Sequence, residues 1–397
     1  MKVSQQYVTK TRIGVLAVSM IGMAALAITP SYAAIAQHFA LNNTSVQMLT
    51  SLPNLFMMVA GLIIGKLTAS KINLKSLTVG SILLVVIGGL LPVFFHESFA
   101  FLIICSCLVG LGQGACTNLT QVLISQILPK KERESTMGIS TTFINIGGVV
   151  FIMGGGQLAA ASSWVNNYWI YLFSLLILLV VLLLLPLHPK DVSGNTSQNQ
   201  EPGKIKLNKY VFYCASWAFL TMLLNNVLNN NISLFVVEQH LGATSQAALT
   251  STISLIGGML CGLIVGIIGK KFRYSSIALS FLLYGVAYLL IGFIHSLIIV
   301  FVGSFLVGAA MSIAMGQFPY LISLAVDDSS VSMALGVYVA IYSVGGVVSP
   351  FIVNPLTAMV KNIGINVFSV SGILAIIISC CCLLFKFQKN LIKNSCN

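Results

Sequence analysis

Charged residues are scarce in this chain: Asp, Glu, Lys and Arg make up 7% of its 397 residues. A soluble domain carries roughly 25% of them, because charged side chains cover its water-facing surface. Hydrophobic residues make up 57% of the chain instead. This composition excludes a soluble globular protein, and lipid is the expected solvent for most of the sequence.

Acidic residues are the rarest of the charged residues, and none falls in the middle of a long apolar run. The eight acids are Glu97, Glu132, Glu134, Asp191, Glu201, Glu238, Asp327 and Asp328. Lys, Arg and His are also missing from the middle of the runs. These sparse residues form no nucleophile–base or metal-ligating cluster, so neither an enzyme nor a cofactor is expected.

Disulfides and nucleic-acid binding are also not expected. Eight of the nine cysteines lie in apolar runs and Cys396 lies in the tail, so none falls in a segment expected outside the cell. The net charge of +12 comes from short basic clusters between apolar runs. Such clusters are signals of membrane topology rather than a surface for nucleic acid.

The apolar runs are long enough to cross a bilayer, since a spanning helix needs about 20 mostly apolar residues. We predict twelve spans, at residues 13–36, 47–67, 75–94, 99–126, 135–160, 166–186, 210–237, 246–268, 274–294, 296–325, 331–355 and 364–385. A hydrophilic linker at 189–209 separates a six-helix bundle at 1–188 from a second one at 210–397. The expected fold class is therefore all-α and integral to the membrane.

The basic residues predict the orientation of these spans. With the N-terminus in the cytoplasm, 19 of the 20 Lys and Arg residues fall on the cytoplasmic side, and Lys361 is the exception. Cytoplasmic loops carry such an excess of basic residues. We therefore expect the protein in the plasma membrane, with both termini and the linker in the cytoplasm.

The two halves repeat at an offset of 198 residues. The matching blocks are Leu108-Val109-Gly110 with Leu306-Val307-Gly308, Leu123-Ile124-Ser125 with Leu321-Ile322-Ser323, Gly138 with Gly336, and Gly147-Gly148-Val149-Val150 with Gly345-Gly346-Val347-Val348. Because each half has six spans, both have the same orientation in the membrane. The repeat is therefore parallel, with an axis along the membrane normal.

Two connections carry a family resemblance. The stretch from Gly65 to Lys75 after the second span and the turn Pro129-Lys130-Lys131-Glu132-Arg133 after the fourth resemble the major facilitator superfamily. The similarity of plan covers essentially the whole chain. Ala69 stands where the family usually has Asp, and Ser106 stands where proton-driven members often have Arg. The resemblance implies two six-helix bundles around a central cavity.

The resemblance also implies that the first helix of each three-helix group lines the cavity. We predict solute-binding roles for the amides and tyrosines of these helices and of span eleven: Gln113, Asn118, Gln121, Asn225, Asn226, Asn229, Asn230, Gln317, Tyr320, Tyr338 and Tyr342. The five amides between Asn225 and Asn231 weaken that helix locally, and partial unwinding is expected there. Hydrogen bonding between helices is the alternative role for these side chains.

A second set of residues is expected to support movement between the bundles. These gating candidates are Gly65, Arg133, Gly147, Gly148, Gly345, Gly346 and Pro350. Static close packing of helices is the alternative role for the glycines.

Together these features predict a secondary transporter that moves a small neutral or amphipathic organic solute by alternating access. The alternatives are a multidrug-type efflux transporter and a proton-coupled organic anion carrier. Since no acid lies within a span, coupling through an intramembrane carboxylate is not expected, and Glu238 with His240 is the nearest titratable pair. The expected partners are the solute and the bilayer, with no nucleic acid, metal or cofactor, and the protein is expected to act as a monomer.

Overall fold

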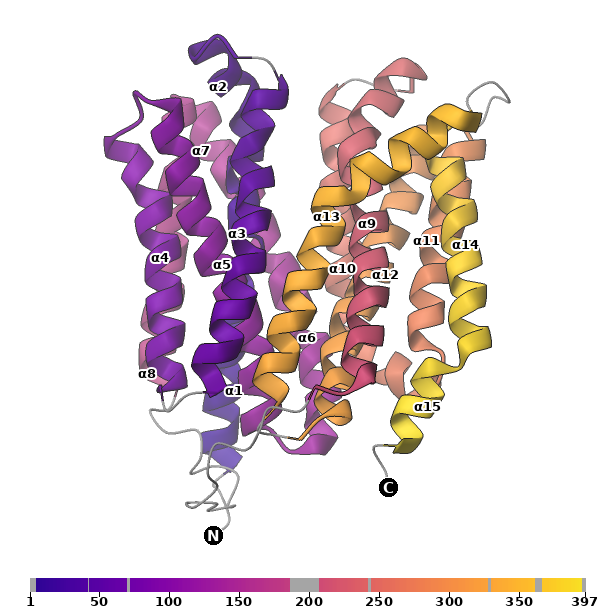
Figure 1. Cartoon of the computed structure of the whole chain (residues 1–397). Coiled ribbons are helices and arrows are strands. Elements are labelled where there is room, and N and C mark those ends of the chain that lie inside the picture. Colours follow the sequence, from indigo (N-terminus) through magenta and orange to yellow (C-terminus); the bar gives the residue numbers. More distant parts are fainter. Residues whose placement is uncertain are drawn as a thin grey trace. The chain divides into compact units, whose positions relative to one another are not determined.

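A computed structural model of the chain describes residues 5–41, 43–69, 72–185, 207–241, 244–327, 330–360 and 366–394, and these residues form only helices and connections (Figure 1). Twelve helices are long and apolar enough to cross a membrane, and each predicted span overlaps one of them. The predicted all-α membrane fold with twelve spans is confirmed.

The first half of the chain forms α1 (Gln5–Ser19), η1 (Met20–Ser31), α2 (Tyr32–His38), α3 (Asn43–Ala69), α4 (Leu74–Phe94), α5 (Phe99–Ile127), α6 (Lys130–Val149), η2 (Val150–Gly154), α7 (Gly155–Ala161), η3 (Trp164–Tyr171) and α8 (Leu172–Leu184). The second half forms α9 (Lys209–Glu238), α10 (Thr244–Lys271), α11 (Ser276–Phe293), α12 (Leu297–Ala325), α13 (Val331–Val360), α14 (Val367–Phe385) and α15 (Phe387–Asn394).

The helices form two compact units. Unit 1 comprises residues 1–133, 143–207 and 326–340, and unit 2 comprises residues 134–142, 208–325 and 341–397. Residues 134–142 of α6 thus belong to unit 2, although the rest of that helix belongs to unit 1, and the start of α13 belongs to unit 1. Most of the linker predicted at 189–209 lies outside the described residues, and the predicted bundle boundaries stay a prediction.

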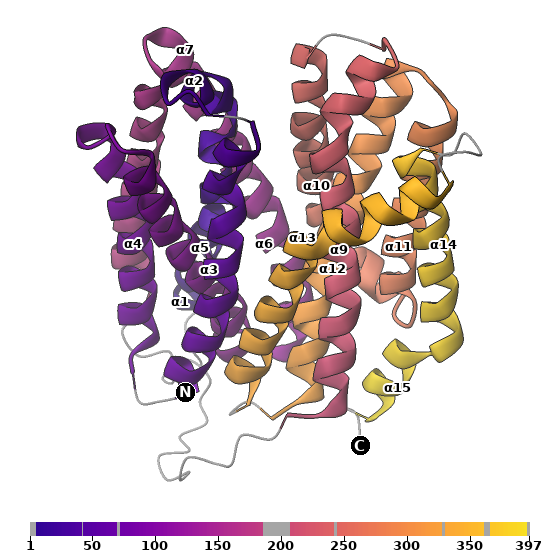
Figure 2. The same ribbon diagram turned by 45° about the horizontal axis from the view of Figure 1, so that its top comes forward.

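Each unit has one end at which its Lys and Arg residues gather, which we call the basic end. In unit 1 this end carries Lys10, Lys66 and Lys75, and in unit 2 it carries Lys209, Lys270, Lys271, Arg273 and Lys386. In unit 2, α11 lies beside α14 and α10 beside α12 (Figures 1 and 2). In unit 1, α3 and α4 both pack on α5.

Glycine allows the central helix of each unit to approach its neighbour closely. A Cβ atom on Gly110 of α5 would lie 2.5 Å from the carbonyl oxygen of Pro53 on α3. On the repeat partner Gly308 of α12, it would lie under 3.0 Å from the carbonyl oxygen of Ser254 on α10. The same close approach therefore recurs in both halves, as the offset of 198 residues predicts.

Departures from the α-helix gather in unit 1. Span one continues from α1 into the 3₁₀ helix η1, with a non-helical residue at Met23 and Pro30 inside it. Span five contains the π-helical turn η2, and span six begins as the 3₁₀ helix η3. These three segments pack against one another. The expected unwinding near Asn225 is wrong, because α9 is a continuous helix through residues 209–238.

Candidate functional site

The predicted amides of α5 have different surroundings within unit 1. Both ends of the Gln113 amide have a partner in the protein: its Oε1 accepts from the backbone N–H of Ala25 at 2.7 Å, and its Nε2 contacts Met57 Sδ at 3.3 Å. Ala25 lies in the 3₁₀ helix η1, two residues after the non-helical Met23. Gln113 therefore supports the distorted first span, and its role in solute binding stays a prediction.

Asn118 and Gln121, further along α5, are buried but only partly satisfied. The Nδ2 of Asn118 donates to the carbonyl oxygen of Gly61 at 3.2 Å. Its Oδ1 and the Oε1 of Gln121 are buried without a hydrogen-bond partner. An unpaired buried acceptor costs about 1–3 kcal/mol. Both oxygens are therefore hydrogen-bond acceptors that the protein leaves unused.

The α13 segment of unit 1 covers this part of α5. A Cβ on Gly336 would lie 3.3 Å from the Nδ2 of Asn118. Gln126 Nε2 of α5 donates to Ser332 Oγ of α13 at 3.2 Å. Tyr338, half a turn beyond Gly336 on α13, is 1% exposed. Ser332 and Gly336 of α13 thus lie against the side chains of Gln126 and Asn118 on α5, although they are far apart in the sequence.

The amides of α9 in unit 2 divide into bonded and exposed side chains. Asn225 Oδ1 accepts from the hydroxyl of Tyr284 at 3.3 Å, and Asn226 Nδ2 donates to its own helix at Met222 O, at 3.0 Å. Asn229 and Asn230 are exposed. At 1.5 Å per residue, Asn229 lies about 30 Å along the axis from the basic end of α9. These exposed amides therefore lie near the far end of the span rather than at its middle.

Gln317 is 1% exposed and makes hydrogen bonds within unit 2. Its Nε2 donates to Glu134 Oε1 at 3.0 Å, and its Oε1 accepts from Ser276 Oγ at 3.1 Å. Ser276 Oγ in turn accepts from Gln388 Nε2 at 2.7 Å. The chain of bonds from Gln388 to Glu134 runs at the basic end of unit 2. Sequence reasoning missed the partners Glu134 and Gln388 of this network.

The remaining predicted tyrosines also lie in unit 2. Tyr342 on α13 is 7% exposed, and Tyr320 on α12 is partly buried one turn from Gln317. Both make polar or ring contacts within the protein. Their roles in solute binding stay a prediction.

The predicted gating residues lie at close contacts and helix ends. A Cβ on Gly65 would lie 3.3 Å from the carbonyl oxygen of Ser332 in unit 1. Arg133 is 6% exposed, and its Nε donates to Leu128 O, at the end of α5, at 3.1 Å. This bond satisfies a carbonyl group that the helix itself leaves open.

The paired glycines pack against the first helix of their own half. A Cβ on Gly147 would lie under 3.0 Å from Met20 O in unit 1, and a Cβ on Gly345 would meet Phe219 O in the same way in unit 2. Their neighbours Gly148 and Gly346 are buried as well. Pro350 lies in α13, and its side chain is outside the described part of the structure. Close packing explains the glycines, and a role in movement stays a prediction.

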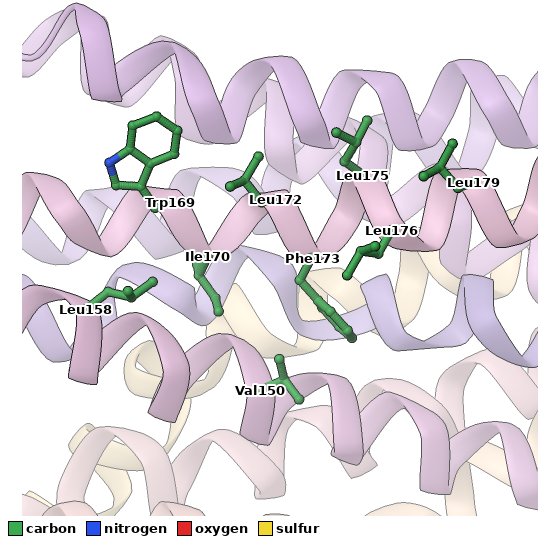
Figure 3. A pocket seen from close by; sticks show the side chains of 9 residues that line it. All are labelled: Val150, Leu158, Trp169, Ile170, Leu172, Phe173, Leu175, Leu176 and Leu179. Atoms are coloured by element: carbon green, nitrogen blue, oxygen red, sulfur yellow. The ribbon is translucent and has the colours of Figure 1, made fainter.

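An open apolar groove on unit 1 does not fit a hydrogen-bonding solute. It has a volume of about 420 Å³, and it is lined by Val150, Leu158, Trp169, Ile170, Leu172, Phe173, Leu175, Leu176 and Leu179 (Figure 3). Leu176 is 60% exposed and Leu179 is 50% exposed. Leucines this exposed on a spanning helix are typical of a surface in contact with lipid.

Metal ligation does not define the site in the described part of the chain. Within the described ranges, no group of three or more His, Cys, Asp and Glu side chains could hold a metal ion. The helix α5, which carries the unpaired oxygens, contains no charged residue. Its polar chemistry is therefore that of amides and hydroxyls.

Two homologous sets of six membrane-spanning helices, with uncharged polar side chains on the first helix of each three-helix group, define a transporter fold. The chain belongs to the Major Facilitator Superfamily, whose family model matches residues 14–350 and 214–390. It is therefore a multi-pass membrane protein of a transporter family, as the resemblance in the sequence predicted.

Solved structures with this fold are similar to the chain at low sequence identity. The human organic anion transporter MFSD10 (TETRAN) has a TM-score of 0.73 at 13% identity, over 96% of this chain and 98% of that chain. The proton:xylose symporter XylE, bound to 6-bromo-6-deoxy-D-glucose, has a TM-score of 0.69 at 16% identity, over 94% and 95%.

A third structure, the E. coli fucose:proton symporter FucP, has a TM-score of 0.69 at 14% identity, over 96% of this chain and 98% of that chain. Identities this low show a common fold and leave the solute open. No curated protein matches the sequence.

Proposed function

We propose that the protein is a secondary transporter that moves a small neutral or amphipathic organic solute across the cytoplasmic membrane by alternating access. The observation that carries this proposal is the pair of unpaired, buried carbonyl oxygens of Asn118 and Gln121 on a span without any charge. Such acceptors fit a solute that donates hydrogen bonds without carrying a charge. The basic ends of both units face the cytoplasm in this proposal, in accordance with the distribution of Lys and Arg.

The similar structures offer two solute classes for comparison. Two of them are named as symporters of the sugars xylose and fucose, which carry many hydroxyl donors. The third is named as an organic anion transporter. A carrier of small anions usually places a Lys or Arg within the membrane. All Lys and Arg residues of this chain lie at the ends of spans or between them, which favours the neutral class.

A thermal-shift screen of the purified protein tests the solute class. The panel contains monosaccharides and polyols, mono- and dicarboxylates, and lipophilic quaternary ammonium compounds at equal concentration. A ligand at 100 times its Kd stabilises the folded state by about 2.7 kcal/mol, so binding raises the melting temperature. We expect the largest shift from a neutral hydroxyl-bearing compound. A carboxylate or a quaternary ammonium compound as the strongest stabiliser would contradict the proposal.

Gln121→Met should weaken solute binding and leave the protein as stable as before or more stable. The change removes an unpaired acceptor and keeps the volume of the side chain, so binding should fall by a few-fold to about ten-fold, the value of one hydrogen bond of 0.5–1.5 kcal/mol. Isothermal calorimetry with the strongest solute of the screen measures the affinity, and thermal melting measures the stability.

Gln113→Met is the matched control on the same helix. It removes the acceptor of the Ala25 N–H, so it should lower the melting temperature. If Gln121→Met destabilised the protein as much as Gln113→Met and left the affinity unchanged, Gln121 would be a packing residue. Asn225 and Asn229, together with Asn226 and Asn230, remain proposed solute contacts toward the far end of the path.

A further inference from the structure

Two basic segments form one surface at the basic end of unit 2. The α10–α11 turn carries exposed Lys270, Lys271 and Arg273, and the second segment carries exposed Lys386, between α14 and α15, and partly buried Lys389 on α15. Gln388 joins the two segments, and it is itself 2% exposed.

The bonds of Gln388 fix the position of α15. Its Nε2 donates to the carbonyl oxygen of Arg273 at 3.0 Å and to Ser276 Oγ at 2.7 Å. Its Oε1 accepts from the N–H of Ile277 at 3.4 Å. The lysines of α15 and the turn therefore have fixed relative positions, and we call them together the basic surface.

The apolar face of α15 is already buried against its own unit. Phe387 is 5% exposed and stacks on Trp217 with ring centroids 5.7 Å apart. Leu391 and Ile392 are 1% and 6% exposed. The helix thus does not need to insert into lipid to hide its apolar side chains, and it presents its lysines on a rigid support.

Exposed apolar side chains adjoin the basic surface. In the turn, Phe272 is 39% exposed and Tyr274 is 46% exposed, with the Lys271 Nζ 6.0 Å from the Phe272 ring centroid. At the end of α14, Leu384 is 79% exposed and Phe385 is 70% exposed, directly before Lys386. Aromatic and basic side chains combined in this way are typical of the boundary between hydrocarbon and headgroups.

The basic surface has little acidic charge to neutralise it. The helices α10, α11, α12, α14 and α15 contain no Asp or Glu. Glu134 at the start of α6 is the acid that faces Lys270 and Arg273, and its Oε1 is bonded to Gln317. Lys271, Lys386 and Lys389 have no acidic neighbour on these helices. The surface is therefore suited to a ligand that combines an anionic group with an acyl chain.

We propose that the basic surface binds the headgroup of an anionic phospholipid, with the phosphate between the α10–α11 turn and α15 and an acyl chain along the exposed end of α14. Basic pockets at the ends of spanning helices recognise anionic lipids by this chemistry. The leaflet in which this occurs rests on the proposed function, since it depends on the orientation. Binding itself depends only on the surface, and its test needs no transport.

The test uses the full chain in phosphatidylcholine vesicles with a trace of spin-labelled phosphatidylglycerol or spin-labelled phosphatidylcholine. Electron paramagnetic resonance measures the fraction of each label held at the protein. We expect the phosphatidylglycerol label to associate more strongly than the phosphatidylcholine label. Loss of one basic residue near the headgroup should lower the association constant by about five-fold, as expected for a contact of about 1 kcal/mol.

The decisive variant is Lys271→Gln with Lys386→Gln, which removes one charge from each segment. Its matched control, Lys10→Gln with Lys66→Gln, removes two exposed lysines of unit 1 and should retain the preference. Lys271→Arg with Lys386→Arg should also retain it, which separates loss of charge from loss of folding. Equal association of both labels with the unmodified protein, or equal loss in the control, would overturn the proposal.

A final arm distinguishes lipid from free phosphate. Phosphatidylglycerol added to the protein in detergent should raise its melting temperature, and inorganic phosphate at the same concentration should not. If inorganic phosphate raised it as much, the surface would be an anion site without lipid specificity, which contradicts the proposal.

Discussion

Gly308→Ala is expected to be strongly destabilising. The added Cβ would lie under 3.0 Å from the carbonyl oxygen of Ser254, a backbone atom that cannot move aside without shifting α10. Overpacking costs typically 1–3 kcal/mol and occasionally more. Because the obstacle is backbone, we expect a loss of about 3 kcal/mol or more, measured as a lower melting temperature and a lower yield of monodisperse protein in detergent.

Gly80→Ala is the matched control for this variant. Gly80 lies within α4, and no atom lies within 4 Å of the position its Cβ would take. Alanine is a better helix former than glycine by up to about 1 kcal/mol, so Gly80→Ala should be neutral or stabilising. Gly110→Ala, the repeat partner, should resemble Gly308→Ala, since its Cβ would meet Pro53 O at 2.5 Å. If Gly308→Ala melted like Gly80→Ala, close packing of α10 on α12 would be wrong.

Most of the fold could be predicted because it depends on composition and periodic signals. Runs of apolar residues give the twelve spans, because hydrocarbon allows hardly any other backbone structure to cross it. The repeat also paired Gly110 with Gly308, and the structure gives both a close contact with a neighbouring helix. These features are local in the sequence or recur in it at a constant offset.

The positions of the irregular helices could not be predicted. A helix departs from α geometry where residues distant in the sequence bond the backbone groups that the departure leaves open. The amides at Asn226 and Asn231 suggested unwinding of span seven, but both donate to a carbonyl four residues earlier and leave α9 intact. The distortion occurs in span one instead. There the Ala25 N–H is satisfied by Gln113, 88 residues away, and the carbonyl oxygen of Ala24 is satisfied by Tyr171.

The candidate site was predicted in residue type more than in role. Three amides of α5 were predicted to bind solute because they lie on the first helix of a three-helix group: Gln113, Asn118 and Gln121. Only the contacts distinguish Gln113, which has a partner at each end of its amide, from the oxygens of Asn118 and Gln121 that lack partners. No periodic signal carries that distinction, because it depends on which helices surround each side chain.

The hydrogen-bond partner of Gln317 could not be predicted from the sequence either. Its partner Glu134 is 183 residues away, in the second turn of α6. In the sequence this acid is one of several that lie at the ends of spans. Within unit 2 the carboxylate is partly buried, and its bond joins residues 134–142 of α6 to α12. The bond joins the first half of the chain to the second, which gives it a role that composition cannot predict.

Gln317→Leu is accordingly expected to release the start of α6. The change leaves Glu134 Oε1 without its donor and Ser276 Oγ without its acceptor. A hydrogen bond to a charged group contributes about 1.5–3 kcal/mol, and each 1.4 kcal/mol changes an equilibrium about ten-fold. Met137 on α6 is 0% exposed, so a cysteine placed there reports whether this segment opens. We expect Gln317→Leu to raise the rate at which Met137→Cys reacts with a maleimide by about ten-fold or more.

Further variants distinguish loss of the Gln317–Glu134 bond from a general loss of packing around α6. Glu134→Gln keeps a carbonyl that can accept from Gln317, so it should raise the reaction rate less than Gln317→Leu does. Ser323 lies on α12, as Gln317 does, and its hydroxyl donates only to the carbonyl oxygen of Tyr320 on that helix. Ser323→Ala should therefore leave the reaction rate unchanged. Glu134→Leu combined with Gln317→Leu should react no faster than the more reactive of the two single variants, because both remove the same interaction. Additive effects of these two changes would mean that Glu134 and Gln317 act separately, and the bond would then have no part in holding α6 closed.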